Sequence, residues 1–266
     1  MNVMRLFRLD GRAAIVTGGS GLYGASICEA LCEAGATVLI ASRDLEKCEL
    51  KARELRGKGY AAHGAKLDLA DERSIETFIA EAAAEYGDID VLVNNSVSRI
   101  GLDDIERTTA EGWAAAQQVN GLGLMLMSKS VVKRMRERGG GAIINIASIQ
   151  GILGPHFPVY GDTGMTSGIE YTYAKWGMVG MTKWLANYYG PHGIRVNCIS
   201  PGGYNPVGTE NEIVQEEFVR NYAERTPLRR MADDTDIKGA IVYLASDASK
   251  YVTGHNLVVD GGWSGW

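Results

Sequence analysis

Short runs of β-branched and other apolar residues alternate along the chain with longer stretches of helical periodicity. The runs predict strands, and the stretches between them predict helices. The expected strands cover residues 13–17, 37–41, 61–67, 91–94, 142–147, 195–200 and 256–259. The expected helices lie near residues 23–34, 45–58, 71–86, 109–138, 171–189 and 235–245.

The alternation of strand and helix indicates right-handed βαβ units and a mostly parallel sheet with helices on both faces. The runs at 37–41 and 142–147 are almost continuously apolar, as in strands that are buried on both sides. We therefore expect an α/β fold with a doubly wound, Rossmann-like sheet, in a single domain over residues 1–266. Ligands of such folds bind beyond the carboxyl ends of the strands.

Composition narrows the possible partners. A net charge of −5 gives no basic surplus for binding nucleic acid, and no segment has the roughly 18 consecutive apolar residues of a membrane span. The four cysteines form no recognisable metal or redox pair, so we expect no metal site and a cytoplasmic location. The expected partner is a small-molecule substrate.

The first expected strand runs into a glycine-rich turn and then a helix. Glycines at 18, 21 and 24 allow a tight turn and a close approach of the backbone to a pyrophosphate, and the helix start offers free N–H groups. The residues expected to contact a dinucleotide here are Gly18, Ser20, Gly21, Leu22 and Tyr23.

The ends of the next strands carry polar residues at the same sheet edge. Ser42 and Arg43 stand where NAD-binding proteins place a carboxylate for the ribose, and an arginine there suits a 2′-phosphate, so NADP(H) is favoured. Asp44 follows directly and keeps NAD(H) possible. Further cofactor-binding candidates at this edge are Asp68 and Leu69 after the third strand and Asn94 after the fourth.

Tyr171 and Lys175 are four residues apart on an expected helix and therefore share one face. A nearby ammonium favours phenolate, so we expect the pKa of Tyr171 to fall from its usual value of about 10. Tyr171 can then exchange a proton with a carbonyl or alcohol oxygen. Ser148 can hydrogen-bond the same oxygen, and Asn120 can hold a water that links Lys175 to solvent.

Together these motifs resemble the single-domain branch of the short-chain dehydrogenase/reductase family, from about Leu9 to Trp263. The resemblance implies a catalytic tetrad of Asn120, Ser148, Tyr171 and Lys175, with the last two also contacting the cofactor. It further implies cofactor contacts from Pro201, Gly202 and Tyr204, a substrate loop over 203–228, and a homo-oligomer, either a tetramer or a dimer. The implied activity is NAD(P)(H)-dependent interconversion of a secondary alcohol and a ketone.

The sequence departs from the family pattern at several points. The glycines have the spacing of the extended branch, residues 94–97 read Asn-Asn-Ser-Val, and the threonine expected soon after Pro201-Gly202 is displaced to Thr209. Tyr171 also lies farther beyond Ser148 than usual. Tyr160 has the usual distance, but Gly164 stands where its lysine would be. We therefore expect an insertion within residues 154–168, acting as a lid on the substrate site.

Parts of the chain resemble gluconate 5-dehydrogenase and reductases of bacterial nonulosonic or flagellin-glycan sugars, which implies a sugar, a sugar acid or another polyhydroxylated substrate. The alternatives are a 3-oxoacyl or other ketone reductase and, from another class, a non-catalytic dinucleotide sensor. The residues expected to contact substrate are Arg99, Gln150, His156, Tyr160 and Asn205.

Overall fold

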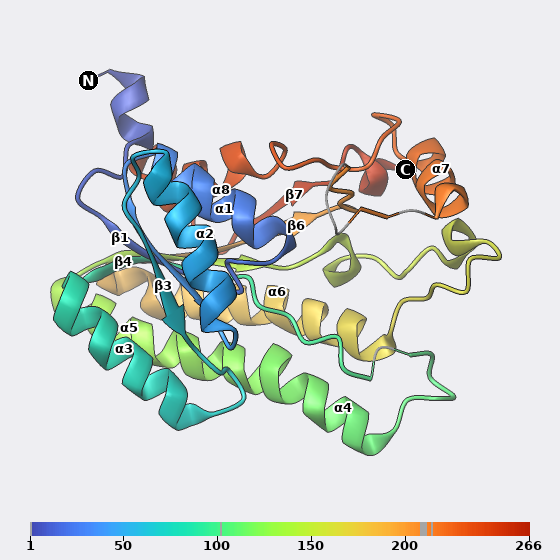
Figure 1. The fold of residues 1–266 in the computed structure, drawn as a ribbon, viewed down its shortest axis with the longest axis horizontal. Coiled ribbons are helices and arrows are strands. Elements are labelled where there is room, and N and C mark those ends of the chain that lie inside the picture. The colour runs from blue at the N-terminus through green and yellow to red at the C-terminus, as the bar shows by residue number, and fades with distance from the viewer. Residues whose placement is uncertain (1, 102, 208–211, 214) are drawn as a thin grey trace.

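The computed structural model describes residues 2–101, 103–207, 212–213 and 215–266. Within these residues seven strands form one parallel sheet in the order β3-β2-β1-β4-β5-β6-β7 (Figure 1). The strands are β1 (Ala13–Thr17), β2 (Thr37–Ser42), β3 (Ala62–Lys66), β4 (Ile89–Asn94), β5 (Gly141–Ile146), β6 (Ile194–Pro201) and β7 (Asn256–Val259). All the expected strands are confirmed, with small shifts at their ends.

Helices cover both faces of the sheet, which confirms the doubly wound fold (Figure 1). They are α1 (Leu22–Glu33), α2 (Leu45–Gly57), α3 (Glu72–Tyr86), α4 (Ala110–Gln117), α5 (Leu124–Arg138), α6 (Ile169–Tyr189), α7 (Glu216–Arg225) and α8 (Lys238–Ala245). Apolar residues of α1, α2 and α8 pack against one face, and those of α3, α5 and α6 pack against the other. No helix in the described part of the chain is long and apolar enough to cross a membrane.

Strand β1 shows why its sequence is apolar throughout. Ala14 and Val16 belong to the core on one face, while Ala13 and Ile15 belong to the core on the other. The strand pairs with β2 on one side and β4 on the other, so the strand order reverses at β1. The loops that leave the carboxyl ends of β1 and β4 therefore diverge, and the crevice between them is where a doubly wound sheet binds its ligand.

The long helix expected over 109–138 is not continuous. A π-helical segment, Gln118–Gly123, separates α4 from α5, and Asn120 lies within it. The Asn120 side chain bonds both backbone groups of Ser98, accepting from its N–H at 2.7 Å and donating to its carbonyl oxygen at 2.9 Å. Gly123 ends the segment, and a Cβ there would come within 2.3 Å of the Leu69 carbonyl oxygen. The π-helical segment thus contacts two loops, the one after β4 through Asn120 and the one after β3 through Gly123.

The sequence did not predict α7, which lies inside the expected substrate loop over 203–228. Phe218 and Tyr222 form its buried side. They pack with the insertion, whose 3₁₀ turn Phe157–Tyr160 lies against α7. Tyr160 stacks on Phe218 with ring centroids 5.4 Å apart. The insertion and α7 therefore form one packed unit above the carboxyl ends of the strands.

Candidate active site

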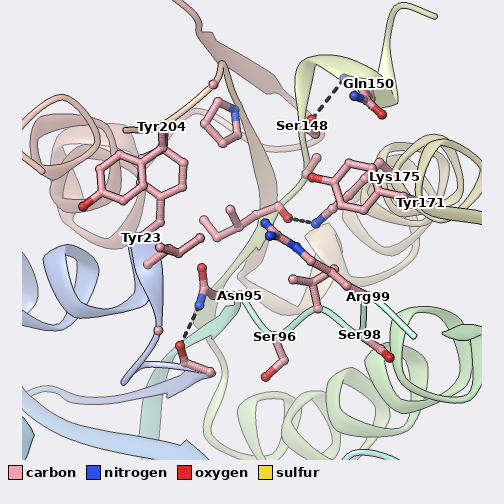
Figure 2. Close-up of a pocket in the computed structure, with 18 of the residues that line it drawn as sticks. Tyr23, Asn95, Ser96, Ser98, Arg99, Ser148, Gln150, Tyr171, Lys175 and Tyr204 are labelled. Atoms are coloured by element: carbon pink, nitrogen blue, oxygen red, sulfur yellow. Dashed lines mark hydrogen bonds between the residues drawn. The ribbon is translucent and has the colours of Figure 1, made fainter. Parts of the chain in front are cut away.

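A cavity of about 910 Å³ opens at the carboxyl ends of the strands. Its walls come from the loops after β1, β2, β3, β4, β5 and β6, from the first turns of α6, and from the insertion and α7. Figure 2 shows part of this lining, from the loops after β1, β4, β5 and β6 and from α6. The expected site residues that line it are Gly18, Ser20, Gly21, Leu22, Tyr23, Ser42, Arg43, Asp68, Leu69, Arg99, Ser148, Gln150, Tyr160, Tyr171, Lys175, Pro201, Gly202 and Tyr204.

The glycine turn has the shape that a pyrophosphate requires. Gly18 has a φ of +63°, a conformation that disfavours any side chain. A Cβ at Gly24 would come within 2.2 Å of the Gly18 carbonyl oxygen. Helix α1 begins at Leu22 with no side-chain cap, so its first N–H groups are free to bind an anion. The turn therefore fits the diphosphate of a dinucleotide.

The end of β2 favours a phosphate over a bare ribose hydroxyl. Asp44 caps α2, accepting from the Lys47 N–H at 3.0 Å, and does not line the cavity. Ser42 and Arg43 do line it. Arg43 has no ion pair with any described residue. Asp44, the carboxylate that could have bound the ribose of NAD, thus caps α2 instead. Arg43 remains available to bind a 2′-phosphate.

Tyr171 and Lys175 lie on the first turns of α6 and face the cavity (Figure 2). Lys175 is 4% exposed, and its Nζ donates to the carbonyl oxygen of Ile146 at 2.6 Å, at the end of β5. The same Nζ lies 5.5 Å from the centroid of the Tyr171 ring. Ser148 follows β5 and accepts from the Gln150 N–H at 3.1 Å. The Ser148 hydroxyl is close enough to Tyr171 to act on its pKa through a side-chain hydrogen bond.

Burial dominates the electrostatics of this group. Burial, with a smaller contribution from the charge of Arg99, lowers the pKa of Lys175 to about 7. Burial raises the pKa of Tyr171, whereas the Ser148 hydroxyl and the Arg99 guanidinium act in the opposite direction. The expectation that the Lys175 ammonium lowers the pKa of Tyr171 is therefore wrong for the chain as described. The reason is that desolvation of Tyr171 outweighs the opposing effects of Ser148 and Arg99 on its pKa.

Arg99 reaches over the cavity toward Lys175 and Tyr171 (Figure 2). It is exposed and forms no hydrogen bond or ion pair with any described residue. Its charge is nevertheless close enough to shift the pKa of both side chains. A cation in this position is available for an anionic group of a bound molecule.

Tyr160 lines the same cavity but belongs to its roof. Burial raises its pKa, and its hydroxyl interacts with Ser167 and Gln150. Ser167 in turn donates to Gln150 Oε1 at 2.6 Å. No lysine acts on Tyr160, whereas Lys175 lies beneath the ring of Tyr171. This geometry favours Tyr171 over Tyr160 as the proton-transfer residue.

The Asn94 side chain does not face the cavity, which corrects that expectation. Asn94 pairs with Asn145 in the β4–β5 register and donates to its Oδ1 at 2.8 Å inside the core. The next residue, Asn95, lines the cavity instead and donates to the carbonyl oxygens of Thr17 and Gly18. Because successive strand residues face opposite sides, the alternation along β4 could have distinguished the two asparagines.

Three other expected residues also lie outside the cavity lining. The Asn120 side chain already forms hydrogen bonds with the Ser98 backbone, so a water at this position would need other hydrogen-bond partners. His156 lies edge-on to Trp263, with centroids 6.3 Å apart, and lines a different hollow. Asn205 is buried and accepts from the Ile213 N–H at 2.7 Å, which braces the loop after β6. Thr209 lies outside the described residues.

The sequence did not single out several residues that line the cavity. Some come from the loop after β4 and from the insertion, and others are buried roof residues of or near α7, which was itself missed. These residues are Ser98, Met165, Ser167, Phe218, Tyr222 and Met231. The described residues contain no cluster of three or more side chains suited to a metal ion.

Comparison with known proteins agrees with this geometry. A family model described as enoyl-(acyl carrier protein) reductase matches residues 20–264. The D-threitol dehydrogenase of Mycolicibacterium smegmatis is 36% identical over 261 residues, covering 97% of this chain and 95% of that protein. The gluconate 5-dehydrogenase of Gluconobacter oxydans is 31% identical over 260 residues, covering 97% and 96%.

A solved structure gives the same result for the fold. The gluconate 5-dehydrogenase of Burkholderia cenocepacia, crystallised with NADP and tartrate, superposes with a TM-score of 0.89 at 31% identity and covers all of both chains. The glycine turn, the Tyr171–Lys175 pair and these full-length similarities lead to one conclusion: the chain belongs to the short-chain dehydrogenase/reductase family.

Proposed function

We propose that the chain is an NADP(H)-preferring oxidoreductase that interconverts a secondary alcohol and a ketone on a polyhydroxylated acid. The observation that carries this proposal is the convergence of Ser148, Tyr171 and Lys175 on one cavity, beside an unpaired Arg99. A dinucleotide held by the glycine turn would place its nicotinamide toward these side chains. When bound, the nicotinamide supplies or accepts the hydride.

The protein's own groups handle the proton. In the reducing direction the Tyr171 hydroxyl donates a proton to the carbonyl oxygen, and the Ser148 hydroxyl stabilises the charge that develops on that oxygen. In the oxidising direction Tyr171 accepts the alcohol proton. Lys175 is held on the Ile146 carbonyl beneath the Tyr171 ring, and in its charged form it would oppose the desolvation that raises the pKa of Tyr171.

Arg99 and the roof give the site its substrate preference. A guanidinium without a partner among the described residues matches a carboxylate, and Gln150 and Ser167 offer hydrogen bonds to hydroxyl groups. A 3-oxoacyl chain instead needs an apolar path free of unpaired charge, which Arg99 disfavours. A site built to hydrogen-bond hydroxyls also rejects analogues that lack them. The relatives named for threitol and gluconate agree with this class.

We further propose that the insertion over 154–168 acts as a lid together with α7. Gly164, Met165 and Ser167 line the cavity, and the 3₁₀ turn packs on α7. Gly161 and Gly164 have positive φ values, so the ends of this turn have backbone freedom that other residues lack.

Self-association is proposed through α5 and α6. Their outer surfaces expose Met125, Tyr173, Trp176, Trp184 and Tyr188. A set of exposed aromatic side chains of this kind is typical of a protein interface and fits a dimer or tetramer. A cytoplasmic location is inferred from the four cysteines, all of which are free thiols.

Tyr171→Phe removes the proton donor and leaves the ring in place. We expect kcat to fall roughly 10²–10⁴-fold with the NADPH Kd nearly unchanged, because general acid catalysis supplies about that factor. Tyr160→Phe is the matched control and should keep most of the rate. Steady-state kinetics and fluorescence titration measure both. An active Tyr171→Phe beside a dead Tyr160→Phe would reverse the assignment.

Arg43→Ala removes the proposed contact to the 2′-phosphate. The loss should weaken NADPH binding by about 1.5–3 kcal/mol, roughly 10–150-fold, and leave NADH binding nearly unchanged. Dissociation constants for both cofactors, measured on wild type and variant, decide the point. Tighter binding of NADH than of NADPH by the wild type contradicts the assignment.

Arg99→Gln tests the acidic group of the substrate. We expect KM for a six-carbon aldonate to rise roughly tenfold or more, since a charge-assisted bond contributes about 1.5–3 kcal/mol. KM for the six-carbon polyol, which has no carboxylate, should change little. Arg107→Gln changes charge equally at an exposed site outside the cavity and is the control. Equal effects on aldonate and polyol would show that Arg99 does not read the carboxylate.

A further inference from the structure

A second hollow, of about 480 Å³, lies behind the roof of the active-site cavity. His156 and Val159 of the insertion line one side, and Asn221, Glu224 and Arg225 of α7 line the other. Trp266 completes the wall, and Figure 1 shows the C-terminus beside α7. None of these residues lines the active-site cavity, so the hollow is a separate feature.

Arg225 is the unusual residue of this hollow. Its guanidinium carbon lies 5.3 Å from the centroid of the Trp263 ring, and Trp263 is 5% exposed. Its Nε is buried without a hydrogen-bond partner, and no described residue forms an ion pair with it. The Nε atom is closed to solvent, but Arg225 as a whole is half-buried and lines the hollow, so the rest of its side chain can meet an acceptor from outside the chain. The Trp266 indole N–H donates to the Arg225 carbonyl oxygen at 3.0 Å and braces this position.

The other groups define what the hollow can hold. The His156 imidazole lies edge-on to the same Trp263 ring and offers a second donor across from Arg225. Glu224 is exposed and is the one carboxylate side chain among the lining residues, so it opposes an anion. An arginine and a histidine that line the hollow beside Trp266 match a small oxoanion, because the guanidinium fork binds two oxygens at once.

The hollow and the active site share a wall. Trp263 stacks on Tyr222 with centroids 4.2 Å apart, and the Tyr222 ring lines the active-site cavity. Asn221 Nδ2 donates to the Val159 carbonyl oxygen at 3.3 Å, which joins α7 to the insertion. A ligand between His156 and Arg225 would add a second link between the two segments that roof the active site.

We propose that this hollow binds a small carboxylate or phosphate ion and that its occupation stabilises the closed roof. By linkage the ion then increases the affinity for substrate, and substrate increases the affinity for the ion by the same factor. The proposed site lies apart from the catalytic groups. Binding of the ion is independent of the proposed function, whereas its coupling to substrate affinity rests on that function.

The binding half is tested by calorimetric titration of inorganic phosphate, with acetate in parallel, into the NADP-saturated protein. Arg225→Gln should weaken binding at least tenfold. Arg220→Gln, an equal charge change at an exposed position on the same helix, should leave it unchanged. Glu224 is also exposed, and Glu224→Gln should tighten phosphate binding at least twofold. This variant tests the site even if Arg225→Gln fails to fold. Stronger binding of phosphate or of acetate identifies the preferred anion.

Wild-type affinity in Arg225→Gln, or unchanged affinity in Glu224→Gln, overturns the site. Binding that is lost in Arg99→Gln but kept in Arg225→Gln would assign the anion to the active-site cavity instead. The coupling half is tested by KM for the aldonate with and without phosphate. KM should fall at least fivefold in wild type and stay constant in Arg225→Gln. Phosphate binding without a change in KM contradicts the coupling, while absence of any turnover counts against the proposed function alone.

Discussion

One buried hydrogen bond organises the catalytic end of the molecule, that from Lys175 Nζ to the carbonyl oxygen of Ile146. It ties the first turns of α6 to the last residue of β5, the strand that leads to Ser148. Burying an ammonium with this single protein acceptor is expensive, and the depressed pKa of Lys175 records that cost. The same contact sets the position of Tyr171 one turn earlier. In the proposed mechanism, proton transfer and cofactor binding therefore depend on how this one side chain is held.

The roof above these groups is built from segments far apart in sequence. The insertion follows β5, whereas α7 follows β6, and they meet through Tyr160, Phe218 and Tyr222. This cluster joins the two segments into one packed unit. The same packing explains why the roof of a polar, charged site is aromatic. The aromatic side chains of the insertion and α7 pack on one another and are thereby buried.

The sequence was sufficient for the sheet and for about half of the cavity lining, because both follow from local signals. Apolar runs marked the strands, and the glycine turn and the Tyr171–Lys175 spacing marked the site. Three features had no local signal. The π-helical turn at Asn120 depends on contacts with Ser98, α7 depends on packing with the insertion, and the pKa directions depend on burial. The alternation of side chains along β4 could have predicted that Asn94 and Asn95 point to opposite sides.

Titration of Lys175 tests the central claim most directly, because its burial on the Ile146 carbonyl underlies the whole arrangement. In protein labelled with ¹⁵N-lysine, the Nζ resonance absent from Lys175→Met identifies this residue. Its pH titration should have a midpoint near the value of about 7 that burial imposes. A midpoint above about 10, where a solvated lysine titrates, would contradict a desolvated Lys175 and with it the catalytic geometry described above.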